Sequence, residues 1–164
     1  MRPIPTCLAV LAISVTSAVH AAELTPQAFA EKAAMADMFE IEASKLVLDK
    51  GSSERVREYA KMMIEHHTAN SQNLRDAASK EGIDLPAALD AELQEKLDAL
   101  KPLADVALDA AYVSAQVSVH TQAVDVFGQY ASSGPGGALE SFAQAAFPTI
   151  RMHLVRVRAF NIEE

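Results

Sequence analysis

The sequence predicts an all-α fold, a four-helix bundle of two antiparallel hairpins joined by a long crossover that holds a short helix. Three observations support this prediction. Apolar residues recur with the helical period of about 3.6 over four long segments. No useful length of chain alternates with the period of two that a half-buried strand requires. Breaks at residues 51–53 and 132–137 divide the long segments into two pairs with short turns.

The first predicted hairpin consists of a helix over residues 26–50 and a second helix that runs to about Lys80. Thr25 supplies a capping hydroxyl, and the proline that follows it suits the first helical position. Gly51 can end the first helix. One of the two serines after this glycine caps the second helix, and Gly82 follows that helix as a stop.

The second predicted hairpin follows a connector that holds a short helix after Pro86. Its first helix is predicted over residues 102–131. The loop 132–137, SSGPGG, is the strongest helix breaker in the chain. The last helix is predicted over residues 138–160, with a kink at Pro148, because a proline inside a helix removes one backbone hydrogen bond.

The N-terminal segment, residues 1–21, has the layout of a secretory signal peptide. A positively charged start is followed by an uncharged apolar run from Cys7 to Val19, and small residues lead to a predicted cleavage site after Ala21. An uncleaved membrane anchor is the alternative, although this apolar run is short for a span of about 20 residues. We expect one mature domain over residues 22–164, with no membrane-spanning segment after cleavage.

Charge and cysteine content restrict the partners and the location that we expect. The 164-residue chain has a formal net charge of −8, which becomes −9 once Arg2 leaves with the signal peptide. Such an acidic protein binds a phosphate backbone or an anionic membrane surface poorly, so we expect no nucleic-acid partner. Cleavage also removes the only cysteine, Cys7. We expect a periplasmic location, with association with the outer membrane and formation of a homo-oligomer both left open.

Each of the four predicted helices carries one ionisable residue at the centre of its apolar face, namely Glu40, His67, His120 and His153. His66 lies about 100° away from His67 around the helix, on the shoulder of the buried face. At about 1.5 Å per residue, all four central residues lie within about 6 Å of the midplane of the bundle. The sequence therefore predicts that these four side chains can meet in the core.

A metal site is the first interpretation of this centre. Three imidazoles and one carboxylate suit a single divalent transition metal ion, Zn²⁺, Cu²⁺ or Fe²⁺. The second interpretation is a closed polar network, in which a charged Glu40 pairs with a protonated imidazole. The third is that the side chains do not meet. A di-iron site is not expected, because the Glu-x-x-His pairs that such bundles use are absent.

Four stretches of the chain resemble successive motifs of a bacterial family of exported, ferritin-like four-helix proteins. The stretches are MFEIEASKLVLDK, YAKMMIEHHTANSQNL, LDAAYVSAQVSVHTQAVDVF and FPTIRMHL. The family is known chiefly as a domain of unknown function, and its members are often labelled outer-membrane proteins. The resemblance covers residues 29–160 and implies a ferritin-like fold, but it implies no established activity.

Carried over position by position, the resemblance marks seven residues as characteristic of the family: Glu40, His67, Asp109, Tyr112, His120, Pro148 and His153. The family tends to have an acidic residue directly before the histidines of the second and third helices, whereas this chain has His66 and Val119. No role for carboxylates at those two positions is therefore carried over. We retain His66, Asp109 and Tyr112 as secondary polar positions.

The function that the sequence favours is metal binding in the cell envelope, for metal handling or stress protection. No nucleophile motif or phosphate-binding loop is present, so we expect no organic cofactor and favour binding over enzymatic activity. Metal-assisted hydrolysis stays open for the case that Glu40 holds a water molecule and not the ion. The alternative is a non-catalytic structural or interaction module whose histidines form a polar network.

Overall fold

The computed structural model describes residues 24–160, so the predicted signal peptide lies outside the described part of the chain. The described residues form five α-helices and no strand: α1 Pro26–Lys50, α2 Glu54–Lys80, α3 Ala91–Leu100, α4 Asp105–Ser133 and α5 Ala138–Arg158. The all-α class is thus confirmed. Over this range, no helix is both long enough and apolar enough to cross a membrane.

The first hairpin follows the predicted bounds because local capping residues fix its ends. The hydroxyl of Thr25 accepts a hydrogen bond from the backbone N–H of Ala28, and Pro26 occupies the first helical position. The hydroxyl of Ser53 accepts a hydrogen bond from the backbone N–H of Val56 and so begins α2. Both contacts involve residues three apart in the chain, which is why the sequence alone predicts them.

Asp109 of α4 holds the turn between α1 and α2. Its Oδ2 accepts hydrogen bonds from the backbone N–H groups of Ser52 (3.1 Å) and Ser53 (2.8 Å) and from the Ser52 hydroxyl (2.9 Å). Gly51 has an extended conformation, with φ of −74°. A Cβ there would lie 2.6 Å from Oδ1 of Asp109 and 2.7 Å from the carbonyl oxygen of Val47. Close approach, and not a left-handed backbone, therefore requires glycine at this turn.

The second hairpin differs from the prediction in its bounds. The helix α4 begins at Asp105 and not near Pro102, because the preceding residues close the end of α3. Here the N–H of Leu103 donates a hydrogen bond to the carbonyl oxygen of Leu100. The helix α4 also runs slightly beyond its predicted end, and α5 ends slightly before its predicted end. Pro148 lies inside α5, as predicted.

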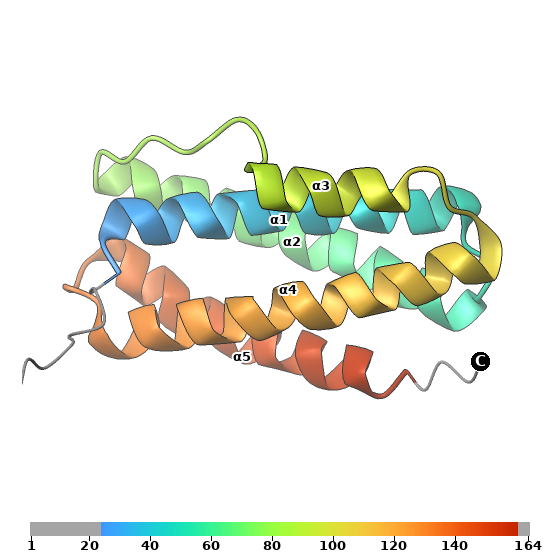
Figure 1. Cartoon of the computed structure of the whole chain (residues 1–164). Helices are drawn as coiled ribbons and strands as arrows, with labels where there is room; N and C mark the ends of the chain where they lie inside the picture. The colour runs from blue at the N-terminus through green and yellow to red at the C-terminus, as the bar shows by residue number, and fades with distance from the viewer. Residues whose placement is uncertain (1–23, 161–164) are drawn as a thin grey trace, which may run out of the picture.

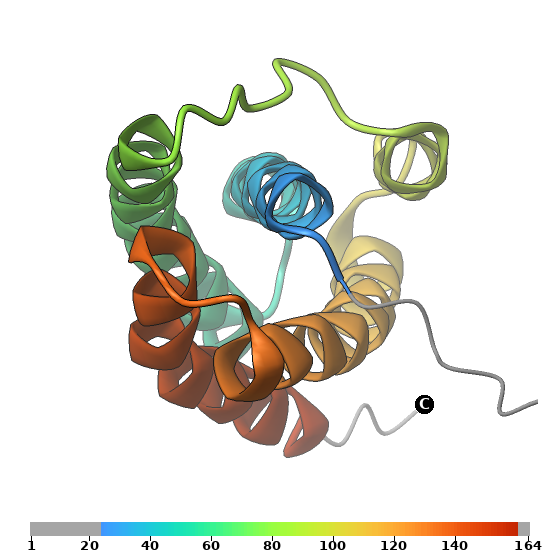
Figure 2. The ribbon, with the colours of Figure 1, turned by 90° about the vertical axis from the view of Figure 1, so that its left-hand side faces the viewer.

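The four long helices α1, α2, α4 and α5 lie side by side, with neighbouring helices antiparallel (Figure 1). α1 packs against α2 and α4, and α5 packs against the same two helices. The crossover from α2 to α4 carries α3, which packs against α1 and α4. Viewed along the long axis, α1 therefore has neighbours on three sides (Figure 2), which buries a wide arc of its surface.

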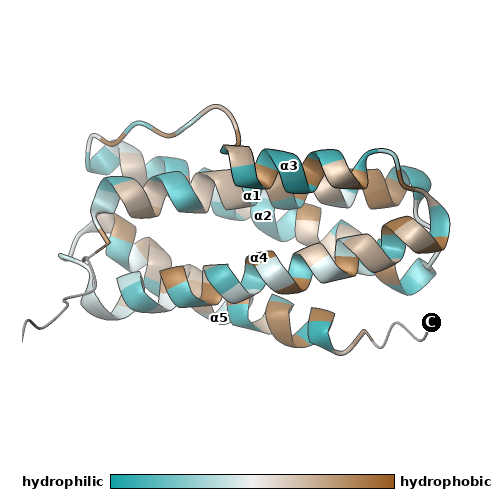
Figure 3. Ribbon diagram, viewed as in Figure 1, coloured by the Kyte–Doolittle hydropathy of each residue, from teal (hydrophilic) through white to brown (hydrophobic). Residues whose placement is uncertain are grey.

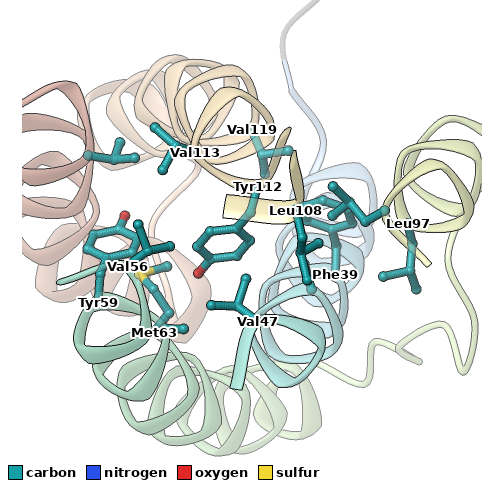
Figure 4. Packing of buried hydrophobic residues seen from close by; sticks show 14 of the residues in the cluster. Phe39, Val47, Val56, Tyr59, Met63, Leu97, Leu108, Tyr112, Val113 and Val119 are labelled. Carbon is teal, nitrogen blue, oxygen red and sulfur yellow. The ribbon is translucent and has the colours of Figure 1, made fainter. Parts of the chain in front are cut away.

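The hydrophobic core consists of two clusters, one towards the α1–α2 turn and one towards the α4–α5 turn. In the first, Val47, Tyr59 and Tyr112 pack together (Figure 4). In the second, the rings of Phe29 and Tyr130 stack with their centroids 4.0 Å apart. Hydrophilic and hydrophobic residues alternate along the long helices (Figure 3), as expected for helices buried on one side. Between the clusters, every long helix contributes buried polar residues.

Candidate metal centre

The buried polar residues between the two hydrophobic clusters are Asp37, Glu40, His67, Gln116, His120 and His153. One ring nitrogen from each of the three histidines lies within 4.8 Å of the other two, which is close enough to hold one metal ion. None of the three histidines is more than 6% exposed. The structure thus brings together residues that are between 33 and 86 positions apart in the chain.

His67 is oriented by a buried carboxylate. Its Nδ1 lies 2.7 Å from Oδ1 of Asp37, so Nδ1 carries a hydrogen that it donates to this oxygen. Asp37 is itself held by the side-chain amide of Asn70, 3.0 Å from both carboxylate oxygens, and by the hydroxyl of Ser71 at 3.2 Å. The other nitrogen of His67, Nε2, is buried and has no hydrogen-bond partner among the described residues.

His120 is oriented by a backbone carbonyl. Its Nδ1 lies 3.1 Å from the carbonyl oxygen of Gln116, and because a carbonyl oxygen only accepts, Nδ1 must carry the hydrogen. In the neutral ring this leaves a lone pair on Nε2. That lone pair faces Nδ1 of His153 at 3.4 Å.

His153 is oriented by the neighbouring histidine of α2. Its Nε2 lies 2.8 Å from Nδ1 of His66, and the two rings stack with their centroids 5.1 Å apart. If Nε2 of His153 donates to His66, then Nδ1 of His153 presents a lone pair to the centre. His66 is half-buried on the shoulder of α2, as expected, but the sequence argument did not foresee its contact with His153.

One pair of the three nitrogens already has the spacing of ligands in a tetrahedral metal site. Two nitrogen ligands about 2.0–2.1 Å from one tetrahedral ion are about 3.4 Å apart, and the nitrogens of His120 and His153 already have this separation. The nitrogen of His67 is within 4.8 Å of both, so it needs to move by at most about 1.5 Å. A carboxylate, a backbone carbonyl and an imidazole hold the second nitrogens, which is the usual outer shell of metal-binding histidines.

Glu40 lies beside His120, on the side of the ring away from the converging nitrogens. Its Oε2 accepts a hydrogen bond from the side-chain amide of Gln116, and its Oε1 lies 3.4 Å from Nδ1 of His120. That nitrogen is not the one that faces His153, so Glu40 lies outside the group of three converging nitrogens. Burial raises the pKa of Glu40 to about 7, although the charge of His67 and the Gln116 hydrogen bond act in the opposite direction.

Burial also decides the charge of the histidines. Burial, together with the smaller effect of the positive charge of His67, lowers the pKa of His120 to about 3 and that of His153 to about 2. Both rings are therefore neutral near pH 7, the form that binds a metal ion. Burial lowers the pKa of His67 as well, but the hydrogen bond and charge of Asp37 and the charge of Glu40 outweigh this, so its pKa is raised.

The two secondary polar residues of α4 lie away from the centre. Asp109 holds the α1–α2 turn, as described above. The hydroxyl of Tyr112 forms a hydrogen bond of 2.8 Å with the hydroxyl of Ser44 inside the first hydrophobic cluster. Both contacts join α4 to the first hairpin, so these residues act on the packing of the helices and not on the histidines.

Asp37 contacts the histidine centre but is not among the residues that the sequence pattern predicts there. It lies about 60° from Glu40 around α1, outside the single apolar stripe that predicts the buried face. Because α1 has neighbours on three sides, its buried arc is wide enough to include Asp37, which is 2% exposed. The available signal was the spacing of Asp37, Glu40 and Ser44, which places three polar side chains along the same side of one helix.

Comparison with known proteins identifies the family. The family described as a domain of unknown function, DUF4142, matches residues 13–160 of the chain. The chain belongs to this family. The bacterial domain of unknown function that the motifs indicated is thus confirmed at the level of the family, and the DUF4142 match spans all five helices.

A solved structure has a similar fold. It is the crystal structure of a protein from Streptomyces coelicolor that is described as a secreted DUF305 protein. The TM-score is 0.67 at 14% sequence identity, over 83% of this chain and 91% of that chain. At this identity the similarity shows the fold alone. No curated protein matches the chain, so the function of this DUF4142 protein is argued from its own geometry.

Proposed function

We propose that the protein binds one divalent transition metal ion through Nε2 of His67, Nε2 of His120 and Nδ1 of His153. The observation that carries this proposal is the buried Nε2 of His67, which has no hydrogen-bond partner among the described residues. A lone pair or an N–H left in this state costs about 1–3 kcal/mol. A metal ion at the point where the three nitrogens converge gives this atom a partner. Protonation does not, because the resulting N–H group would still lack an acceptor among the described residues.

A closed polar network is the competing function of the same residues, and the 3.4 Å contact between His120 and His153 favours it. In that network His66 donates to His153, and His153 donates in turn to Nε2 of His120. This series of hydrogen bonds gives partners to the ring nitrogens of three of the four histidines. It leaves Nε2 of His67 without a partner among the described residues. A metal ion gives the buried Nε2 of His67 a partner as well, so the metal site is the better explanation of the geometry.

Imidazole ligands narrow the choice of metal. Three neutral histidines suit Zn²⁺, Cu²⁺ or Fe²⁺ and do not favour Mg²⁺ or Ca²⁺, which prefer oxygen ligands. Glu40 would act on the ion through His120 rather than as a fourth ligand, which revises its proposed role in the four-residue site. Binding without turnover, as in metal handling or protection of the cell envelope, is the role that we assign to this centre.

Two broader assignments belong to the same proposal. The long crossover between two antiparallel hairpins supports a ferritin-like topology. The structural neighbour that is described as secreted supports export of this chain. The periplasm as the location and residues 1–21 as a cleaved signal peptide are the further parts of this proposal, and they rest on the sequence pattern. Intact mass measurement of protein recovered from the cell envelope tests this, and retention of residues 1–21 would contradict it.

Metal analysis of protein produced without a histidine tag tests the proposed function. The protein is loaded with Zn²⁺, dialysed and analysed for zinc, together with His120→Ala and the control Glu65→Gln. Glu65 is an exposed carboxylate on the same helix as His67. We expect one equivalent of zinc in wild type and in Glu65→Gln, and none in His120→Ala. Loss of zinc from the wild type on dialysis would contradict the proposal and favour the polar network.

A further inference from the structure

We infer that the bound metal ion has an open fourth coordination position that faces the groove between α2 and α5 and accepts a small anion from solution. The inference rests on the proposed metal site. It goes beyond that site by assigning a second ligand, its chemical class and its route. A closed site of four protein ligands stores or structures a metal ion, whereas three protein ligands leave one position for an exogenous ligand.

The groove between α2 and α5 leads to the histidines. It has a volume of about 700 Å³, is open to solvent, and is lined by His66, His67 and His153. His120 is not part of its lining, and Glu40 lies on the far side of the His120 ring. A ligand in the groove can therefore approach the ion from the side away from His120 and Glu40. None of the described side chains competes for the coordination position on that side.

The walls of the groove carry small side chains on the side of α5 that leads to His153. Along α5 they consist largely of small residues, including Ala145, Ala146 and Thr149. Thr149 lies one helical turn before His153, so its side chain stands beside the approach to the ion. Asn70 faces the groove from α2 but is already bound to Asp37. The small side chains beside His153 leave room for a small ligand to reach the ion.

Charge favours an anion at this position. A divalent ion on three neutral imidazoles brings two positive charges into a buried site. Asp37 supplies one negative charge through its hydrogen bond with His67. Neither Asp37 nor Glu40 belongs to the groove lining, so neither carboxylate of the polar layer faces the open position. A monoanion that reaches this position from the groove binds the positive ion directly through one atom.

Azide is a suitable probe, because it is a small monoanion that coordinates through one nitrogen. The protein is loaded with Co²⁺, which replaces zinc and absorbs visible light according to its ligands. We expect a saturable change of the Co²⁺ spectrum on addition of azide, and no change with perchlorate at the same ionic strength. Thr149→Leu, which narrows the approach, should bind Co²⁺ fully but bind azide about tenfold more weakly.

Val155→Leu is the matched control, since Val155 lies on the outer face of the same helix, 70% exposed and outside the groove. It should respond to azide as wild type does. Bound Co²⁺ whose spectrum does not respond to azide would overturn this inference and leave the proposed function standing. An equal azide affinity of Thr149→Leu and wild type would overturn the assigned route. Failure of the wild type to bind Co²⁺ would overturn the proposed function and the inference with it.

Discussion

At the scale of single residues, the hydrogen bond on one ring nitrogen decides what the other nitrogen of a histidine can do. Asp37, the carbonyl of Gln116 and the ring of His66 each occupy one nitrogen of a central histidine. The remaining nitrogens converge. The proposed ligands and the residues that orient them are therefore different residues. Substitution of a ligand should abolish zinc binding, whereas substitution of an orienting residue should weaken it.

Substitution of the two adjacent histidines of α2 should have different effects on zinc binding. His67→Ala removes a proposed ligand and should abolish binding of one equivalent of Zn²⁺. His66→Ala removes only the group that orients His153, so stoichiometric binding should persist with an affinity lower by about 10–100-fold. Competition with a chromophoric zinc chelator measures both affinities. Equal loss in the two variants would mean that His66 is itself a ligand.

Asp37→Asn should weaken zinc binding by about 10–100-fold without abolishing it, because the carboxylate orients His67 and raises its basicity. The isosteric amide can still accept the hydrogen bond from Nδ1 but carries no charge. Asp49→Asn is the matched control, since Asp49 is exposed on the same helix. The same chelator competition measures the change. An unaltered affinity in Asp37→Asn would exclude Asp37 from the site.

Glu40 should make the stability of the metal-free protein depend on pH. Burial is the main cause that raises its pKa from 4.5 to about 7. The folded state therefore binds more protons between these values, and the charged form costs stability above about pH 7. This cost is relieved as the pH falls through 7 and is gone below about pH 4.5.

Glu40→Gln cannot titrate at this position, and its side chain can still accept the Gln116 hydrogen bond. Its stability relative to wild type should be highest above about pH 7 and should decline towards about pH 5. Thermal unfolding in the presence of EDTA across this range measures the difference. A difference that stays constant with pH would show that Glu40 does not titrate in this range.

At the scale of helices and turns, Asp109 joins the start of α4 to the α1–α2 turn through three hydrogen bonds. Asp109→Asn should lower the free energy of unfolding by about 1.5–3 kcal/mol, because these bonds are made to a charged group. Zinc stoichiometry should not change, since Asp109 lies about 16 Å from His120 along α4. Asp125→Asn, an exposed change on the same helix, is the control for chemical denaturation. A loss of zinc binding in Asp109→Asn would contradict this separation of roles.

The parts of the fold that the sequence predicts well are those that depend on near neighbours in the chain. Thr25 and Ser53 cap their helices through residues three positions away. The start of α4 was not predictable, because it depends on how Leu103 closes α3. Asp37 was missed for a related reason: its burial depends on α1 having three neighbours, which a single helical stripe does not reveal.

The convergence of His67, His120 and His153 was predictable, because helical rise fixes their depth and the apolar pattern fixes their direction. The hydrogen-bond partners of the other ring nitrogen of each histidine were not predictable from the sequence. They depend on side-chain rotation, which places His66 against His153 and Glu40 against His120. The groove between α2 and α5 likewise follows from the spacing of two helices and leaves no signature in the sequence.

At the scale of the whole molecule, the three proposed ligands come from α2, α4 and α5, and Asp37 links α1 to His67, so a bound ion should stabilise the entire fold. Zinc at about 100 times its dissociation constant should add about 2.7 kcal/mol to the free energy of unfolding. For a domain of this size, this corresponds to a rise in Tm of about 5–10 °C. Differential scanning calorimetry with and without zinc measures the shift, and His67→Ala should show none. An equal rise in both proteins would indicate binding elsewhere.

X-ray absorption spectroscopy of the zinc-loaded protein tests the central claim most directly, because it counts and identifies the ligands of the ion. We expect three imidazole nitrogens at about 2.0–2.1 Å, with one further light atom from water or an anion. A first shell dominated by carboxylate oxygens, or one with fewer than three imidazoles, would contradict a centre built from His67, His120 and His153.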